Sequence, residues 1–144
     1  MQKEEAMRLE ISAHSHNESF ARAVVGAFVA RANPTLEEVA DIKTAVSEAV
    51  TNSIVHGYKN DPSGLIEIRA ILRENELEVQ ISDTGCGIEN IEEAMEPFYT
   101  SLPEQERSGM GFAVMQAFMD DVQVESTPGE GTHIVMRKTL CTGR

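Results

Sequence analysis

Cysteine and basic residues are scarce in this sequence, and both shortages exclude classes of function. Only Cys86 and Cys141 are present among 144 residues, the first between two glycines and the second close to the final residue. Cysteines so placed argue against a structural disulfide or a metal site. Twelve basic residues stand against 24 acidic ones, which gives a formal net charge of −12. Because this charge repels a phosphate backbone, we expect no direct nucleic-acid partner.

Long hydrophobic runs are missing as well. No stretch has the length of a membrane-spanning helix, and residues 1–5 lack the apolar core of a signal peptide. We therefore expect a cytoplasmic protein without a membrane partner. The hydrophobic share of 41% is ordinary for a globular protein, and repeats and low-complexity segments are absent. These properties predict one domain, residues 1–144, around a single core.

Alternation of apolar and polar residues predicts the strands. The first covers residues 7–13 and is expected at an edge of the sheet. Residues 66–72 and 77–82 alternate on either side of a short connection, which predicts an antiparallel hairpin. A second hairpin is expected from strands that begin at Val122 and Thr132.

Helical spacing of apolar residues predicts the other elements. The first long helix would end near Arg31 and the second at Gly57, followed later by a short helical turn at 91–95 and a largely buried helix at 109–119. Two capping boxes are expected where the long helices begin, namely Ser15 with Glu18 and Thr35 with Glu38.

The order of these elements predicts an α/β (α+β) two-layer sandwich with a mostly antiparallel sheet. Helices stacked on one face of a single sheet bury the apolar sides of both layers. No parallel βαβ series opened by a glycine-rich turn is present, which argues against a dinucleotide-binding Rossmann fold.

A line of polar residues marks the end of the second helix. Glu48, Asn52 and His56 recur at steps of four and therefore share one helix face. Asn52 offers a neutral oxygen of the kind that Mg²⁺ accepts beside waters and triphosphate oxygens. Glu48 could orient or deprotonate an attacking hydroxyl. The ordinary alternative is a polar helix flank, with His56 bonded to the last helical carbonyls.

Two glycine-containing stretches follow this helix. Asp83 stands where a strand ends, and Gly85 and Gly87 let the backbone bend and approach a flat ligand closely. A carboxylate there would accept from the exocyclic amine of adenine and disfavour guanine, although Asp and Gly also build simple turns. Gly109 and Gly111 begin a predicted helix, where free N–H groups can receive phosphates.

In their order and spacing these stretches resemble the Bergerat fold of the gyrase, chaperone and histidine-kinase ATPases. Within that superfamily the chain is similar to the anti-sigma factor serine kinases over nearly its whole length, most clearly at 17–22, 48–52, 56–58 and 106–112. The resemblance implies ATP or ADP with Mg²⁺, and Asn52 as the metal ligand. The residues that it implies for nucleotide binding are Asn52, His56, Asp83, Gly85, Gly87, Ser108, Gly109, Met110, Gly111 and Thr132.

The resemblance also implies a function. Proteins of this kind bind and inhibit a sporulation sigma factor, and they phosphorylate a serine of an anti-anti-sigma factor with Mg-ATP. They are expected to be homodimers. The alternatives are a nucleotide-dependent sigma-binding module without kinase activity, a general-stress-type anti-sigma kinase, and a detached catalytic domain of a histidine kinase. The short lid and the missing acceptor helix disfavour the last.

Arg107 is a second catalytic candidate beside Glu48. It is the only cation between Pro97 and Gly109, in a segment (101–108) that lacks apolar periodicity and is expected to be a mobile loop. Its guanidinium could bridge γ-phosphate oxygens or contact the protein partner. It could equally be a solvated residue that balances neighbouring glutamates.

Overall fold

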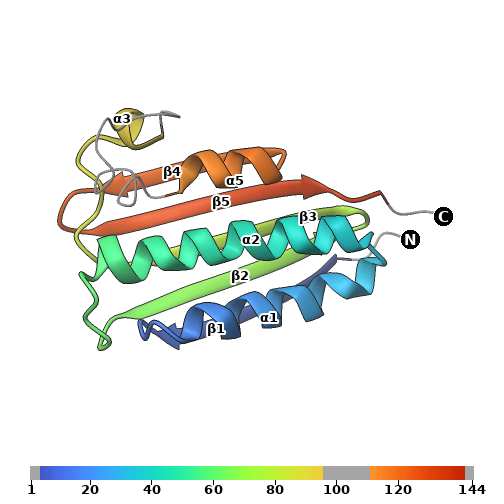
Figure 1. The fold of residues 1–144 in the computed structure, drawn as a ribbon, viewed down its shortest axis with the longest axis horizontal. Helices are drawn as coiled ribbons and strands as arrows, with labels where there is room; N and C mark the ends of the chain where they lie inside the picture. The colour runs from blue at the N-terminus through green and yellow to red at the C-terminus, as the bar shows by residue number, and fades with distance from the viewer. Residues whose placement is uncertain (1–3, 96–110, 142–144) are drawn as a thin grey trace.

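The computed structural model describes residues 4–95 and 111–141, which form a five-stranded sheet covered on one face by helices (Figure 1). The strand order is β1-β2-β3-β5-β4, and every neighbouring pair is antiparallel. The predicted two-layer sandwich, edge strand and two hairpins are therefore confirmed. The strands are β1 (Glu4–Ser12), β2 (Leu65–Arg73), β3 (Glu76–Asp83), β4 (Asp121–Thr127) and β5 (Gly131–Thr139).

The helical layer has α2 in the middle, with α1 packed on one side of it and α5 on the other (Figure 1). Within the described residues, no helix is both long and apolar enough to cross a membrane. The helical elements are α1 (Asn17–Val29), the 3₁₀ turn η1 (Ala30–Ala32), α2 (Leu36–Asn52), the π-helical turn η2 (Ser53–Gly57), α3 (Ile91–Met95) and α5 (Phe112–Phe118).

The core lies between α2 and the sheet. The face of α2 opposite Glu48 is fully buried, and it meets the alternate, inward-facing residues of the central strands. Each fully buried Val or Ile side chain stabilises the fold by about 1.5–3 kcal/mol. The buried set includes Ile42, Val46, Ala49 and Val50 of α2 and Ile66, Ile68, Val79 and Ile81 of the sheet.

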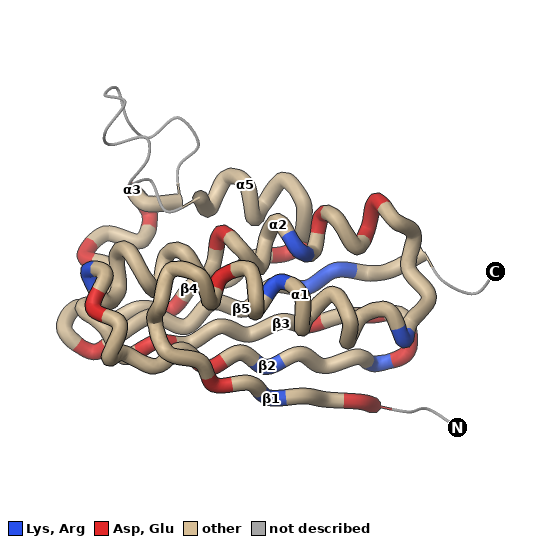
Figure 2. Tube along the Cα trace, turned by 60° about the horizontal axis from the view of Figure 1, so that its bottom comes forward, with Lys and Arg blue, Asp and Glu red and all other residues tan. Residues whose placement is uncertain are grey.

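Charged residues of both signs occur along the strands of the sheet (Figure 2). Glu78 is 7% exposed, and its Oε1 lies 3.4 Å from a guanidinium nitrogen of Arg73 and 3.2 Å from one of Arg137. The buried apolar side chains lie instead between the sheet and the helices.

One of the two predicted capping boxes is present in the structure, and the other is not. Thr35 and Glu38 form the expected reciprocal pair at the start of α2. The box assigned to Ser15 is wrong, because α1 begins at Asn17 after His16 and has no side-chain cap. Glu18 lies one position too early in α1 to reach back, and it pairs instead with Arg22 at 3.1 Å.

Two predicted helix limits also differ from the structure, and a third is met in a different helical geometry. The α-helical part of α1 stops at Val29, and Asn33 in the left-handed region (φ 58°) ends the following 3₁₀ turn. The helix that ends at Gly57 finishes in π geometry. The last helix starts at Phe112 and buries only one side, with Phe112 and Met115, because it flanks α2 at the margin of the layer.

Candidate functional site

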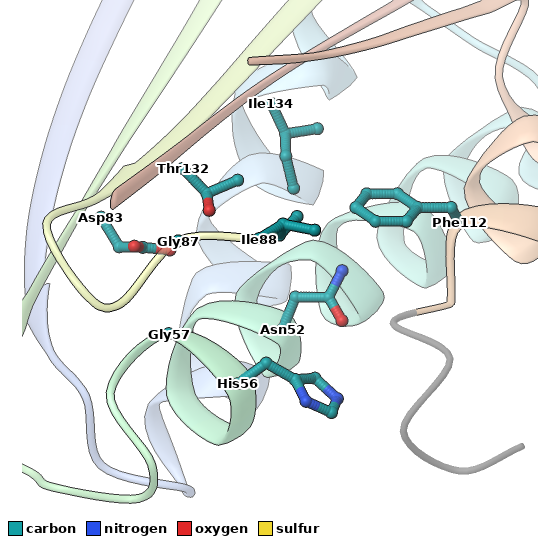
Figure 3. A pocket seen from close by; sticks show the side chains of 9 residues that line it. All are labelled: Asn52, His56, Gly57, Asp83, Gly87, Ile88, Phe112, Thr132 and Ile134. Carbon is teal, nitrogen blue, oxygen red and sulfur yellow. The ribbon is translucent and has the colours of Figure 1, made fainter. Parts of the chain in front are cut away.

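A pocket opens between the end of α2, the loop after β3, the start of α5 and β5 (Figure 3). Its volume is about 260 Å³ including the open mouth. Five of the residues predicted for nucleotide binding line it together. The lining residues are Asn52, His56, Gly57, Asp83, Gly87, Ile88, Phe112, Thr132 and Ile134.

Asp83 forms the polar end of this pocket. It is the last residue of β3, it is 7% exposed, and each of its carboxylate oxygens accepts one hydrogen bond. The Ser53 hydroxyl donates to Oδ2 at 2.7 Å, and the Gly85 N–H donates to Oδ1 at 3.0 Å. The carboxylate is therefore held in one orientation, with a second lone pair on each oxygen left for a ligand.

The loop after Asp83 is clamped by close backbone contacts. A Cβ on Gly85 would lie 2.2 Å from the Gly57 carbonyl oxygen, and that oxygen also accepts the Cys86 N–H at 2.8 Å. Gly87 has φ +77°, and a Cβ there would lie 2.3 Å from the carbonyl oxygen of Thr127. Only glycine fits at either position. The π-helical turn brings Gly57 into this contact, and such turns often occur at functional sites.

Thr132 lies directly opposite Asp83 in the β3–β5 register. Its hydroxyl is 2.9 Å from that of Ser126, which also accepts the Ile88 N–H at 2.7 Å and donates to the Gly131 carbonyl at 2.9 Å. A donor and acceptor network thus fixes the Thr132 hydroxyl beside the Asp83 carboxylate.

Several supporting residues were not identified from sequence. Ser53, Ser126 and Tyr58 are examples, since each acts through a partner on another element. The Tyr58 hydroxyl accepts the Thr84 N–H at 2.8 Å and donates to the Leu65 carbonyl. The only signal in the sequence is a serine or tyrosine beside a motif, which is too common to single out.

Asn52, the last residue of α2, lines the pocket beside His56, with the apolar pair of Ile88 and Phe112 on its other side (Figure 3). It is 8% exposed, and its Nδ2 is buried without a hydrogen-bond partner among the described residues. Buried polar atoms are normally bonded, so an unpaired amide facing a pocket indicates a place for a polar ligand. The amide oxygen and nitrogen can be exchanged by a flip, so either can face the ligand.

His56 and Glu48 continue the predicted polar line on either side of Asn52. His56 is half-buried, and burial lowers its pKa, with a smaller contribution from Lys59. It therefore favours the neutral imidazole. Burial raises the pKa of Glu48, and the nearby carboxylate of Glu18 raises it further. A carboxylate with a raised pKa is a better proton acceptor.

Glu48 does not line the pocket but touches the beginning of α5. A Cβ on Gly111, which has φ +62°, would lie 2.2 Å from Glu48 Oε1. Gly111 therefore leaves the space that the Glu48 carboxylate fills. The other residues of that predicted stretch, Ser108, Gly109 and Met110, lie outside the described residues, as does Arg107 with its expected loop.

The donor set limits which metal this pocket could hold. Among the residues described by the structure, no three His, Cys, Asp or Glu side chains cluster as a metal site. Mg²⁺ is nevertheless compatible with a single amide oxygen, because it keeps waters and takes phosphate oxygens as its other ligands. Both thiols are free and exposed, and Cys86 Sγ contacts the His56 carbonyl oxygen at 3.0 Å.

Comparison with known sequences gives extensive similarity. Residues 11–138 match the histidine kinase-like ATPase domain family. An anti-sigma F factor of Clostridium perfringens (strain SM101 / Type A) is 57% identical over 136 residues, 94% of this chain and 97% of the relative. The anti-sigma F factor of Caldanaerobacter subterraneus subsp. tengcongensis is 53% identical over 144 residues, the full length of both chains.

Comparison with solved structures supports the fold. The RsbU and RsbW domains of a Mycobacterium tuberculosis protein align with a TM-score of 0.69 at 21% identity, over 94% of this chain and 32% of that one. The nucleotide-free catalytic domain of histidine kinase ThkA aligns with a TM-score of 0.58 at 14% identity, over 94% and 96% of the two chains. The Bergerat-type sandwich expected from the sequence is thus confirmed.

Proposed function

This chain belongs to the histidine kinase-like ATPase domain family, alongside anti-sigma F factors, and we propose that it is an anti-sigma factor with ATP-dependent protein serine kinase activity. It binds and inhibits a sporulation sigma factor, and it phosphorylates a serine of an anti-anti-sigma factor. We further propose that it acts as a cytoplasmic homodimer of this single domain. The identity of its relatives over nearly their whole length supports the sigma-binding part.

The held carboxylate of Asp83 is the observation that carries the nucleotide assignment. Its free lone pairs face a pocket with apolar walls from Ile88, Phe112 and Ile134, which suit a flat purine. Adenine presents an amine to such an acceptor, whereas guanine presents a carbonyl oxygen that the carboxylate would repel. The pocket therefore favours adenine nucleotides over guanine nucleotides.

The triphosphate is assigned to the side of the pocket where Asn52 and Gly111 lie. The unpaired amide of Asn52 fits a role as the protein ligand of Mg²⁺ or a contact to phosphate oxygens. Mg²⁺ bound there would neutralise charge on the phosphates during transfer. Because His56 favours its neutral form, it supplies no positive charge to the phosphates. We therefore assign it only a position beside Asn52.

Glu48 is proposed to act on the incoming serine. Its carboxylate is half-buried beside Gly111, and the raised pKa favours taking up a proton. As the serine oxygen bonds to the γ-phosphorus, the bond to the ADP oxygen breaks and the serine proton passes to Glu48. General-base assistance of this kind is worth about 10²–10⁴ in rate.

The test is to mix the protein with Mg-ATP and candidate serine-bearing anti-anti-sigma proteins, and to locate added phosphate by mass spectrometry. We expect one phosphoserine on the partner and the formation of ADP. A protein that binds ATP and a sigma factor, yet is inert toward every such partner, would instead be the binding-only module. Glu48 argues against that alternative, because a module that only holds nucleotide has no use for a base beside it.

A further inference from the structure

We infer that Ser53 is a positioning residue for adenine recognition, because its hydroxyl sets the orientation in which Asp83 meets the base. This inference rests on the proposed adenine site and goes beyond it. It makes the selectivity for an amine depend on a residue that does not line the pocket.

The geometry is that of a buried, charge-assisted hydrogen bond. Ser53 is 2% exposed and Asp83 is 7% exposed, and their oxygens are 2.7 Å apart. The Gly85 N–H donates to the other carboxylate oxygen at 3.0 Å. Two donors, one on each oxygen, restrict rotation of the carboxylate. With one donor alone the carboxylate could still rotate.

The position of Ser53 in the helix supports a specific role for its hydroxyl. Ser53 is the first residue of the π-helical turn, and its neighbours Ala49, Val50 and Ile54 are all buried apolar residues. A hydroxyl among them must be bonded to avoid a desolvation cost. Asp83, which is far away in sequence, is the partner that the fold provides.

Losing the hydroxyl should affect the amine contact more than any other part of nucleotide binding. The carboxylate would keep only the Gly85 donor and would sample orientations that no longer point at the amine. A hydrogen bond to a charged group is worth about tenfold or more in affinity. The contacts of the sugar and phosphates, which bind elsewhere, should be unchanged.

The experiment compares two ligands on three proteins. ATP carries the exocyclic amine, and purine riboside 5′-triphosphate has hydrogen in its place. Calorimetry would give the affinity of both for the wild type, Ser53→Ala and Ser63→Ala. Ser63 is the matched control, since its hydroxyl donates to Asp61 at 2.8 Å in an exposed loop away from the pocket.

We expect Ser53→Ala to weaken ATP about tenfold and to leave the amine-free analogue within about twofold, while Ser63→Ala changes neither. Equal losses for both ligands, or no loss of ATP affinity, would overturn the inference. Ser53→Cys keeps a weaker donor and should give an intermediate preference, which provides a second test if the alanine variant unfolds.

The wild type separates this inference from the proposed function. A wild type that does not bind ATP, or that binds both triphosphates equally, contradicts the adenine assignment itself. A wild type that prefers ATP, with Ser53→Ala retaining that full preference, contradicts the role of Ser53 alone.

Discussion

The two ends of the pocket differ in how their polar groups are bonded. At the Asp83 end, both carboxylate oxygens and the hydroxyls of Thr132 and Ser126 are bonded to other parts of the chain. At the Asn52 end, the amide nitrogen is buried without a partner among the described residues, and the carboxylate of Glu48 has a raised pKa beside Gly111.

We propose that this difference separates nucleotide recognition at the Asp83 end from phosphate transfer at the Glu48 end. Groups that are bonded before a ligand arrives lose little entropy on binding it, which favours affinity and selectivity. Groups left without partners are costly in the folded protein, and a ligand relieves that cost. We therefore expect changes at the Asp83 end to alter which nucleotide binds, and changes at the Glu48 end to alter what happens to it.

The largest expected effect is at the Glu48 end. Glu48→Gln removes the proton acceptor while keeping the size and a hydrogen-bonding group, so serine phosphorylation should fall by about 10²–10⁴. ATP affinity and sigma-factor binding should survive. Rates from quenched phosphorylation assays, with calorimetry on the same samples, would check this. Phosphorylation at the native rate would show that Glu48 is not the base.

Asp83→Asn should differ from Glu48→Gln in that it lowers the affinity for ATP. An amide carries a donor where the amine of adenine needs an acceptor, and a lost charge-assisted hydrogen bond costs about 1.5–3 kcal/mol, or more than tenfold in affinity. Calorimetry of ATP against the folded variant measures the loss. Native ATP affinity would remove Asp83 from adenine recognition.

Gly111→Ala tests the contact between Gly111, at the start of α5, and the Glu48 carboxylate of α2. A side chain in the left-handed region costs about 1–2 kcal/mol, and here it would also displace the Glu48 carboxylate. Gly129 is a matched control, because it has φ +82° and a Cβ there would meet nothing within 4 Å. Urea unfolding should show a loss of stability in both alanine variants.

Phosphorylation should fall only in Gly111→Ala, since only that variant disturbs Glu48. If Gly129→Ala lowered phosphorylation equally, the effect would reflect backbone strain in general. If neither variant lowered it, the contact between Gly111 and Glu48 would have no role in the reaction.

The smallest effect concerns the titration of Glu48. Burial is the main cause of its raised pKa and the carboxylate of Glu18 is the second, so Glu18→Gln should lower the pKa of Glu48 toward its usual range without restoring it. Because the folded-state pKa is raised, the protonated form of Glu48 stabilises the fold below the unfolded pKa. That contribution is lost as pH rises through the folded value. NMR titration of the Glu48 carboxyl carbon would measure its pKa in the wild type and in Glu18→Gln. An unchanged pKa in Glu18→Gln would exclude the coupling between the two carboxylates.

Local patterns in the sequence predicted the elements and several of the residues that line the pocket. Alternation indicated both hairpins, Thr35 with Glu38 indicated the start of α2, and Asp83 with Asn52 indicated two walls of the pocket. The bond from Ser53 to Asp83 could not be predicted, since it spans 30 positions and depends on how α2 packs on β3. The π-helical turn was also missed, because the apolar spacing of residues 36–57 does not distinguish π from α geometry.

The start of α1 differs from the predicted capping box at Ser15 because of a tertiary contact. The spacing to Glu18 was correct for a cap, but the helix begins one residue later than that cap requires, at Asn17. The Asn17 side chain donates to the Ser12 carbonyl at 2.9 Å, which ties the start of α1 to the end of β1. A tertiary contact of this kind sets the start of the helix, and the spacing of neighbouring residues in the sequence does not predict it.

The orientation of the nucleotide is the central claim, and a crystal structure of the protein with Mg-ADP tests it most directly. We predict that the exocyclic amine of adenine lies within hydrogen-bond distance of the Asp83 carboxylate, while Asn52 contacts Mg²⁺ or the phosphates. Ser53 should still donate to Asp83 in that complex. A nucleotide bound outside this pocket, or one with its phosphates at Asp83 and its base near Glu48, would contradict the account.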